Sequence, residues 1–476
     1  MQPLEHEEVK RVLDLTDETG HRLYLVGGYP RDALLKAEGK LELVVPKDFD
    51  FAIEGGHGFA FARHVANKME GHFVPLDEPN DTARVVLPNS TVFDFSGCVG
   101  GTIQSDVWRR DFTINSLVWD PQTPDYILDF STGLADLQSK RVRALSEASF
   151  VEDPLRVLRA YRFASHINGT IEAKTRNWLQ AHVPKLSTVA VERINVEIFA
   201  IFGGSNFSKF VFDMAHAGVL ETIFPELTDT HKVTPNAYHH LGLFEHSLET
   251  IPQLEETYGR MPEWVRESAQ KELSSATTRL AATKLACLLH DIGKPQTWVV
   301  NDDGRHTFYG HDRIGAEMAE LIAERMKWSR PLSKFIVKLI AWHLRPGQLY
   351  HQGPPTDKAI RRFYRTVGED TPELMLLAFA DFGATRGPGL MGDKREALAY
   401  SLVELLEGYR VHREESRMRV KLLDGNQIMK ILEIPGGPIV GNLLAELEEA
   451  QEFNEVANLA EAVAFVRQMY EEKYSK

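Results

Sequence analysis

Cysteine is scarce in this sequence, with Cys98 and Cys287 the only two among 476 residues. This number excludes a disulfide framework and a zinc site made of thiolates alone, since each needs more cysteines. Long apolar runs are also missing, because no segment reaches the roughly 20 residues of a membrane-spanning helix. No N-terminal signal peptide is visible either, so we expect a cytoplasmic protein without a membrane partner.

Positive charge is in deficit. Lys and Arg number 54 against 68 Asp and Glu, which gives a formal net charge of −14. Indiscriminate binding to nucleic acids is therefore not expected, because it depends on a broad basic surface. A local basic track for one structured RNA is compatible with this balance, since direct contacts are set by patches rather than by the summed charge.

A glycine turn near the amino end has the features of a phosphate site. Residues 21–26 form an apolar, β-branched run that predicts a strand. Gly27 and Gly28 follow, and they permit a tight turn that brings bare backbone amides close to a phosphate. Arg31 would lie in the first turn of the next helix, where its guanidinium can hold a triphosphate oxygen.

Two carboxylates follow the turn. Asp48 and Asp50 lie in an extended segment and therefore point to the same face. Carboxylates on one face repel unless a cation lies between them, and Mg²⁺ prefers such ligands together with phosphate oxygens. The alternative is a plain turn beside solvated aspartates. Asp94 alternates with apolar neighbours on another predicted strand. It is either a third carboxylate near the metals or an ordinary charge that faces the solvent.

Two later motifs make the resemblance specific. Residues 109–117 read Arg-Arg-Asp-Phe-Thr-Ile-Asn-Ser-Leu, and residues 152–156 read Glu-Asp-Pro-Leu-Arg. With the glycine turn and the Asp-x-Asp pair in front of them, the chain resembles the bacterial class II nucleotidyltransferases, the group of tRNA CCA-adding enzymes and poly(A) polymerases. The resemblance implies an α/β nucleotidyltransferase head of the polymerase β type, followed by an all-α neck.

The resemblance also implies roles for individual residues. In the family, the equivalents of Asp153 and Arg156 hydrogen-bond the incoming base and so act as a protein template. Asp153 before a proline is also an ordinary helix start, over a helix expected at 153–164. The expected catalytic residues are Asp48, Asp50 and Asp94, and the expected nucleotide-binding residues are Gly27, Gly28, Arg31, Arg110, Asn115, Asp153, Arg156, Arg159 and Arg162.

Arg156, Arg159 and Arg162 recur every third residue, so they lie near one another on a helix. Such a row is repulsive unless anions meet it, which favours a bound nucleotide. Arg110 is preferred over Arg109 for the nucleotide's sugar or phosphates, because the family spacing to the later motif favours it.

A second group of possible ligands lies in predicted helices further along. In order, these residues are His246, His290, Asp291, His311, His343 and Asp381. Their order resembles the metal-binding core of the HD phosphohydrolase superfamily, including its six-ligand, two-metal version. Histidine with carboxylate suits Mn, Ni, Co, Zn or Fe better than Mg alone. Lys294 would stabilise the charge of a phosphoryl group. The HD-type domain is either an active hydrolase or a scaffold.

The remaining segments complete the organisation. Residues 187–202 resemble the family's neck helix. We expect a functional role only for Arg193 and a packing role for the other residues of this helix. Residues 255–278 are polar and predict an exposed helix or an insertion, and the Gly-Gly-Pro segment at 436–438 is either an RNA contact or a simple turn. The expected domains are a head at 1–145, a neck at 146–225, an HD-type domain at 226–420 and a helical tail at 421–476.

We therefore expect a tRNA 3′-end nucleotidyltransferase that adds C and/or A from CTP and/or ATP and releases pyrophosphate. Its partner would be the acceptor arm of tRNA, recognised through A-form backbone shape. The sequence departs from the family pattern in three places. Pro30 stands where the family usually has valine, and the gap from Arg31 to Asp48 is longer than in many members. Residues 77–85 are more similar to relatives that add only part of the CCA terminus or poly(A), so the choice of nucleotide stays open. The alternatives are a poly(A) polymerase and an HD phosphohydrolase with a nucleotide-sensing head.

Overall fold

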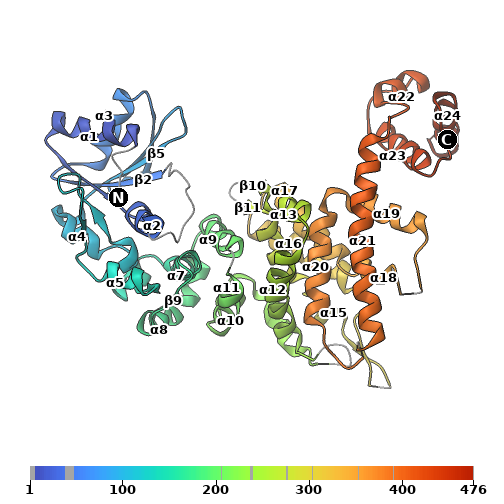
Figure 1. Cartoon of the computed structure of the whole chain (residues 1–476), viewed down its shortest axis with the longest axis horizontal. Helices are drawn as coiled ribbons and strands as arrows, with labels where there is room; N and C mark the ends of the chain where they lie inside the picture. Colours follow the sequence, from blue (N-terminus) through green and yellow to red (C-terminus); the bar gives the residue numbers. More distant parts are fainter. Residues whose placement is uncertain are drawn as a thin grey trace.

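The protein is elongated, with a β-sheet at one end and a small group of helices at the other (Figure 1). The computed structural model describes residues 6–37, 48–204, 206–235, 240–274, 277–302, 304–351, 353–389 and 391–474. The predicted long gap between Arg31 and Asp48 falls mostly on residues 38–47, outside the described residues.

The amino-terminal part is a mixed seven-stranded sheet in the order β3-β4-β5-β2-β1-β6-β7. Only β2 and β5 pair in parallel among these neighbours, and the other pairs are antiparallel. The strands are β1 (Arg22–Val26), β2 (Asp48–Glu54), β3 (His72–Asp77), β4 (Thr82–Val86), β5 (Val92–Gly97), β6 (Val118–Trp119) and β7 (Ile127–Leu128). The helices of this part are α1 (Glu7–Thr19), α2 (Gly28–Ala37), α3 (Gly58–Lys68), α4 (Ile103–Trp108) and α5 (Gly133–Gln138), with short 3-10 helices η2 (Val99–Gly101) and η3 (Thr113–Asn115).

Alternation along the two central strands separates apolar from acidic side chains. Phe49 stacks on Phe93 with ring centroids 5.5 Å apart, and all of the phenylalanines of β2 and β5 are buried with residues of α1 and α3. The parallel register places Asp50 opposite Asp94. Because side chains alternate with period two, burial of the phenylalanines directs the aspartates to the other face of the sheet.

The helical part begins with α6 (Ala148–Glu152), α7 (Arg156–His166), α8 (Ala173–His182), η4 (Val183–Thr188), α9 (Val191–Gly203), α10 (Ser208–His216), α11 (Val219–Ile223) and η5 (Pro225–Lys232). A two-stranded parallel pair, β8 (Arg141–Val142) and β9 (Thr170–Ile171), lies beside them. The helices expected at 153–164 and 187–202 begin later than predicted, with α7 at Arg156 and α9 at Val191. Asp153 is extended and accepts the Leu155 N–H at 3.2 Å, so it begins the turn that leads into α7. Residues 187 and 188 belong to the 3-10 helix η4.

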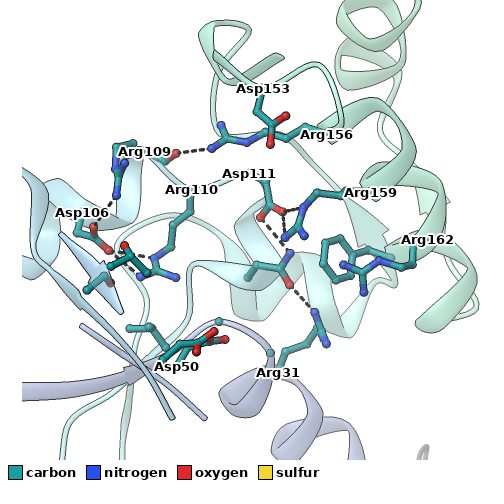
Figure 2. Close-up of a pocket in the computed structure, with 18 of the residues that line it drawn as sticks. Arg31, Asp50, Asp106, Arg109, Arg110, Asp111, Asp153, Arg156, Arg159 and Arg162 are labelled. Atoms are coloured by element: carbon teal, nitrogen blue, oxygen red, sulfur yellow. Dashed lines mark hydrogen bonds and ion pairs between the residues drawn. The ribbon is translucent and has the colours of Figure 1, made fainter. Parts of the chain in front are cut away.

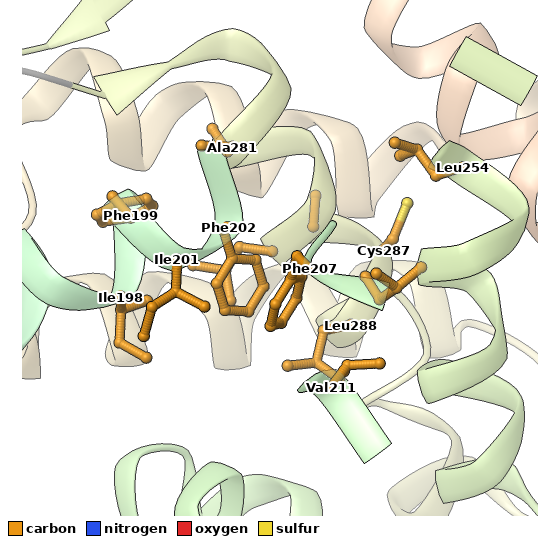
Figure 3. Packing of buried hydrophobic residues seen from close by; sticks show 14 of the residues in the cluster. Ile198, Phe199, Ile201, Phe202, Phe207, Val211, Leu254, Ala281, Cys287 and Leu288 are labelled. Atoms are coloured by element: carbon orange, nitrogen blue, oxygen red, sulfur yellow. The ribbon is translucent and has the colours of Figure 1, made fainter. Parts of the chain in front are cut away.

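Aromatic packing joins this neck to the helices that follow. The rings of Phe202 and Phe207 have centroids 4.2 Å apart. Figure 3 shows the two rings facing each other, with Ile198, from the same helix as Phe202, on one side and Leu288 on the other. One continuous hydrophobic core includes Phe112 of the head and extends to Tyr409. The neck therefore packs with the head on one side and with the next helices on the other.

The next part is a bundle of helices. It contains α12 (Leu243–Arg260), α13 (Glu263–Gln270), α14 (Arg279–Leu289), α15 (Lys294–Thr297), α16 (His311–Arg325), α17 (Arg330–Trp342), α18 (Arg345–Gln348), α19 (Asp357–Val367), η6 (Gly368–Asp370), α20 (Thr371–Ala384) and α21 (Asp393–Met418). Two short antiparallel pairs accompany it, β10 (Glu272–Ser274) with β11 (Thr277–Thr278), and β12 (Val299–Val300) with β13 (His306–Thr307).

The prediction of an exposed helix or insertion over 255–278 is wrong for much of this segment. Val265 and Ala269 of α13 are fully buried, and α13 contacts α14 and α20. Their spacing of four residues places them on one helix face, and this narrow apolar stripe is sufficient for packing despite the polar composition.

The tail forms a separate small core. Its helices are α22 (Gly425–Leu432), α23 (Pro438–Glu452) and α24 (Leu459–Tyr474). The long helix α21 leads to this group (Figure 1). Asp424 begins α22 with a capping box that includes Gln427. In the part of the chain that the structure describes, no helix has the length and apolar character to cross a membrane.

Candidate functional site

A cavity of about 560 Å³ lies where the head meets the neck, and its lining is mostly charged (Figure 2). The head contributes the β1–α2 turn, β2, β5, α4 and residues 109–115, and the neck contributes the start of α7 and one residue of α9. The lining arginines are Arg31, Arg109, Arg110, Arg156, Arg159, Arg162 and Arg193, and the lining aspartates are Asp50, Asp94, Asp106, Asp111 and Asp153.

The glycine turn and the Asp50 carboxylate touch at the floor of this cavity. Gly27 has φ +73°, and a Cβ atom at this position would lie only 2.5 Å from Asp50 Oδ2. Asp50 is exposed to the cavity, although protein atoms crowd around its carboxylate. Partial desolvation by these atoms, with the nearby charge of Asp94, raises the pKa of Asp50 to about 6. A carboxylate in this situation is stabilised by a cation, so the donor set fits a divalent metal.

Asp94 has a partner that the sequence analysis missed. Arg84 lies directly opposite Asp94 on β4 and donates two hydrogen bonds to its carboxylate, of 2.7 and 2.8 Å. Asp48 shares the face of Asp50 at the start of β2 but is exposed and does not line the cavity. Among the described residues of the head, no three ligating side chains bring their ligand atoms within 4.8 Å of one another.

Arg31 is more constrained than the sequence predicted. It is 5% exposed, and its guanidinium donates to both carboxylate oxygens of Asp32 and to Asn115 Oδ1. Asn115 donates in turn to Asp111, which also accepts two hydrogen bonds from Arg159, of 2.6 and 2.8 Å. Burial opposes ionisation of Asp111, but Arg159 and these hydrogen bonds outweigh it and lower its pKa. Arg31 lines the cavity with its guanidinium already paired, and its predicted contact with a triphosphate remains a prediction.

The arginine row on α7 is met by carboxylates of the chain itself. Arg162 donates to Glu197 Oε2 at 2.6 Å, and Arg159 lies 3.6 Å from the other oxygen of Glu197. The Phe163 ring lies within 4.2 Å of the Arg162 guanidinium carbon. The anions that the row was expected to meet therefore include carboxylates of the chain itself. A glutamate among the apolar residues of α9 was the signal that could have revealed Glu197, since a buried charge needs a partner.

The two residues expected to recognise the base lie at the neck side of the cavity. Arg156 donates to the backbone carbonyls of Ser149 and Arg109, at 3.2 Å each. Asp153 accepts a hydrogen bond of 2.8 Å from Arg193 of α9. Both side chains are therefore held in place by contacts with other segments, and Arg193 has a defined role in holding Asp153.

Arg109 and Arg110 both line the cavity, but their partners differ. Arg110 donates to Asp106 Oδ2 at 2.7 and 3.2 Å, and it is one of the positive charges that act on Asp50. Arg109 donates to Asn80 at 3.0 Å. Asp106 precedes Arg110 by four residues on one helical turn, a spacing that could have indicated this pair from the sequence.

The six HD-type residues come together in the helical bundle. The shortest nitrogen–oxygen distances are 3.2 Å from Asp291 to His290 and to His311, and 3.1 Å from Asp381 to His246. Two groups have ligand atoms close enough to hold an ion, and Asp291 belongs to both: His246, His290 and Asp291, and then Asp291, His311 and His343.

Backbone carbonyls orient three of the histidines. The Nδ1 atom of each lies 2.6–2.7 Å from the carbonyl oxygen three residues earlier, which is Cys287 for His290, Phe308 for His311 and Ile340 for His343. With Nδ1 donating to a carbonyl, Nε2 is left as the ligand atom. The pKa of Asp291 is well below its usual value, because His290 and Lys294 outweigh burial. Lys294 is paired with Asp291, so its ammonium is engaged within the cluster.

Comparison with known proteins agrees with this architecture. Three family profiles match: the poly A polymerase head domain over 23–143, the probable RNA and SrmB-binding site of polymerase A over 169–230, and the HD domain over 243–382. An A-adding tRNA nucleotidyltransferase from Deinococcus radiodurans is 31% identical, covering 94% of this chain and 95% of the relative. The chain belongs to the tRNA nucleotidyltransferase family.

Other members of the family show the same extent of similarity. A CC-adding tRNA nucleotidyltransferase from Geobacter sulfurreducens is 29% identical, covering 96% of this chain and 94% of the relative. The solved structure of the Thermotoga maritima CCA-adding enzyme complexed with tRNA has a TM-score of 0.60 at 21% identity, covering 97% of this chain and 95% of that chain. The predicted family and fold class are confirmed, and the chain is a nucleotidyltransferase.

Divalent metals are usual in both the head and the HD families, and the His and Asp groups described above could hold them. The match over 169–230 places an RNA-binding region in the neck.

Proposed function

We propose that this chain transfers CMP, AMP or both from CTP and ATP to the 3′ end of tRNA, with release of pyrophosphate. One observation carries the proposal. The carboxylate pair of Asp50 and Asp94 opens into the same cavity as Asp153 and Arg156, whose side chains are fixed by other segments. A reacting phosphate and a recognised base therefore fit in one site. The named relatives add A, CC or CCA to tRNA, and none of those cited is a poly(A) polymerase.

Asp48 and Asp50 are the proposed Mg²⁺ ligands, with Asp94 beside them. When bound there, magnesium would lower the pKa of the RNA 3′-hydroxyl and neutralise the leaving pyrophosphate. Arg84 orients the Asp94 carboxylate through two hydrogen bonds. Gly27 and Gly28 line the cavity, and without side chains their backbone amides can approach the phosphates closely.

Base selection is assigned to Asp153 and Arg156. A carboxylate accepts from a base amino group, and a guanidinium donates to base carbonyls and ring nitrogens. Fixed partners of this kind discriminate by about 1–3 kcal/mol for each good bidentate contact. Arg159, Arg162, Arg110 and Asn115 surround the remaining space for the nucleotide.

The proposed RNA partner is the acceptor arm of tRNA, which the neck and tail would contact through backbone shape rather than sequence. The Gly-Gly-Pro turn before α23 contributes to this surface in the proposal. We also propose that the protein acts in the cytoplasm, where tRNA, CTP and ATP are present together.

A second activity, hydrolysis of a phosphate ester, is favoured by the HD cluster. His290 Nε2 and Asp291 Oδ1 are buried without a hydrogen-bond partner, as expected for atoms that bind a metal. We propose that this cluster holds Mn, Ni, Co, Zn or Fe, because its ligands are mainly imidazole nitrogens. His246, His311, His343 and Asp381 would complete the ligand set.

The transfer proposal is tested with tRNA ending at each truncation of the CCA sequence, one nucleoside triphosphate at a time. A sequencing gel should show addition that stops after one to three nucleotides. Asp50→Ala should abolish this addition, whereas the matched variant His290→Ala should retain it. Long A tails on arbitrary RNA, or full activity of Asp50→Ala, would refute the proposal.

A further inference from the structure

A second cavity, of about 550 Å³, lies in the helical bundle at the ends of α16, α17, α18 and α19. It is nearly as large as the cavity at the head, and none of the residues proposed above for nucleotidyl transfer lines it. A space of this size suits a ligand of roughly nucleotide dimensions.

Positive charge dominates the rim of this second cavity. Arg345, Lys358 and Arg362 line it, and Asp312 is its single acidic residue. The local excess is notable because the whole chain carries a net charge of −14. A cavity lined by cations on an otherwise anionic protein has a positive local potential, which favours the binding of anions there.

Most of this charge is available for a ligand. Within the part of the chain that the structure describes, the Arg345 side chain has no hydrogen bond or ion pair, and it is exposed. Arg362 lies 3.4 Å from Glu449, and Lys358 lies 3.9 Å from Glu455. Lys358 Nζ also lies 5.2 Å from the centre of the Phe453 ring. Long, partly exposed ion pairs contribute little to stability, so both cations can turn to a bound anion.

An aromatic surface lies beside the cations. Trp342 and Phe363 both line the cavity; Phe363 is buried and Trp342 is half-buried. The indole face of Trp342 can accept any nucleobase by stacking, with Phe363 packed behind it, and arginine next to it adds phosphate recognition. Cations and aromatic rings together favour a nucleotide over inorganic phosphate, which has no use for a stacking face.

The cavity is also next to the HD cluster along the chain. Asp312 follows His311 at the start of α16, and Trp342 precedes His343 at the end of α17. The same two helices therefore carry lining residues of the cavity and possible metal ligands.

We propose that this cavity binds a nucleoside phosphate, with the base against Trp342 and the phosphate between Arg345, Lys358 and Arg362. The ligand is either a free nucleotide or the 3′-phosphorylated end of an RNA. This binding requires neither the metal nor hydrolysis.

A local readout is needed, because the head cavity also has features of a nucleotide site. We would label the full-length protein with 5-fluorotryptophan and assign the Trp342 signal by its loss in Trp342→Phe. Titration with AMP should shift this ¹⁹F resonance, and adenosine should shift it at least about tenfold less efficiently, because the charged hydrogen bonds are absent. A short RNA with a 3′-phosphate, compared with the same RNA with a 3′-hydroxyl, distinguishes the RNA end from the free nucleotide.

The double variant Arg345→Ala/Arg362→Ala should weaken the AMP-induced shift by at least about tenfold. The matched control is Arg313→Ala, because Arg313 lies on α16, pairs with Glu317 on the same helix and does not line the cavity. It should titrate like the wild type. An unmoved Trp342 signal with both AMP and the 3′-phosphorylated RNA would overturn the proposal, as would inorganic phosphate acting as well as AMP. Neither result would affect the transfer proposal, which is measured by tRNA extension.

Discussion

Replacement of Gly27 by alanine tests whether the close approach of the glycine turn to Asp50 supports activity. The new Cβ atom would lie 2.5 Å from Asp50 Oδ2, at a backbone φ of +73°. An L residue in this left-handed conformation costs about 1–2 kcal/mol, and the contact also forces the Asp50 carboxylate to move. A displacement of about 1 Å at a reacting centre can lower the rate about 100-fold.

We therefore expect Gly27→Ala to lose about 1–2 kcal/mol of unfolding free energy and about 100-fold in kcat for nucleotide addition. Denaturant titration measures the first quantity and single-nucleotide extension of tRNA the second. In an Asp50→Ala background the steric contact is absent, so Gly27→Ala should cost less stability there than in the wild type. Such a double-mutant cycle isolates the contact between the two positions.

Two other glycines are matched controls. A Cβ atom at Gly28 would have Arg31 Nη2 as its nearest neighbour, at 3.4 Å, so Gly28→Ala should retain its stability. Gly20 has φ +69° but nothing within 4 Å, so Gly20→Ala should lose stability and keep its kcat. The reasoning is refuted if Gly27→Ala is as active as Gly20→Ala.

Three further predictions concern other parts of the protein. Arg193→Ala releases Asp153 and should lower the ratio of correct to incorrect base addition by about tenfold, the equivalent of ~1.4 kcal/mol, with little change in unfolding free energy; competition between CTP and ATP on one tRNA measures it. Asp111→Asn removes the buried charge that pairs with Arg159 and should destabilise the protein by about 3–5 kcal/mol near neutral pH. Because the pKa of Asp111 in the folded protein is lowered from 3.8, the stability difference between wild type and variant should shrink as the pH falls below 3.8; denaturation at pH 6 and pH 3 measures it. Addition of Mn²⁺ to metal-free protein should stabilise it by about 2.7 kcal/mol at 100 times Kd, and His290→Ala should abolish this thermal shift.

Each of these predictions has an outcome that contradicts it. Unchanged selectivity in Arg193→Ala would show that Asp153 does not depend on Arg193; Lys327→Ala, which breaks an exposed ion pair with Glu192 nearby, is the control. A stability loss in Asp111→Asn that is equal at pH 6 and pH 3 would exclude the ionised carboxylate as the cause. A full Mn²⁺ response in His290→Ala would place the metal elsewhere.

Local sequence patterns predicted several parts of the structure well. Alternation of phenylalanine and aspartate on β2 and β5 gave the faces of the sheet, because a strand reverses side-chain direction at every residue. The Gly27–Gly28 pair predicted a tight turn, and Gly27 does adopt positive φ. The order of the HD residues predicted a group that the structure brings together.

Other features could not be predicted because they depend on neighbours that are distant along the chain. Asn115, 84 residues away from Arg31, holds its guanidinium. The arginine row was expected to meet anions, and the carboxylates of Asp111 and Glu197 supply them from within the chain. A periodic pattern gives the direction of a side chain but not the groups that other segments place in front of it.

The sequence by itself determined the family, the order of the functional segments and the face on which each carboxylate lies, since these depend on residue identity and local backbone geometry. Only the tertiary structure decided the charge partners: Arg84 for Asp94, Arg193 for Asp153 and Glu197 for Arg162. Their strength depends on distances of about 3 Å between segments that only folding brings together.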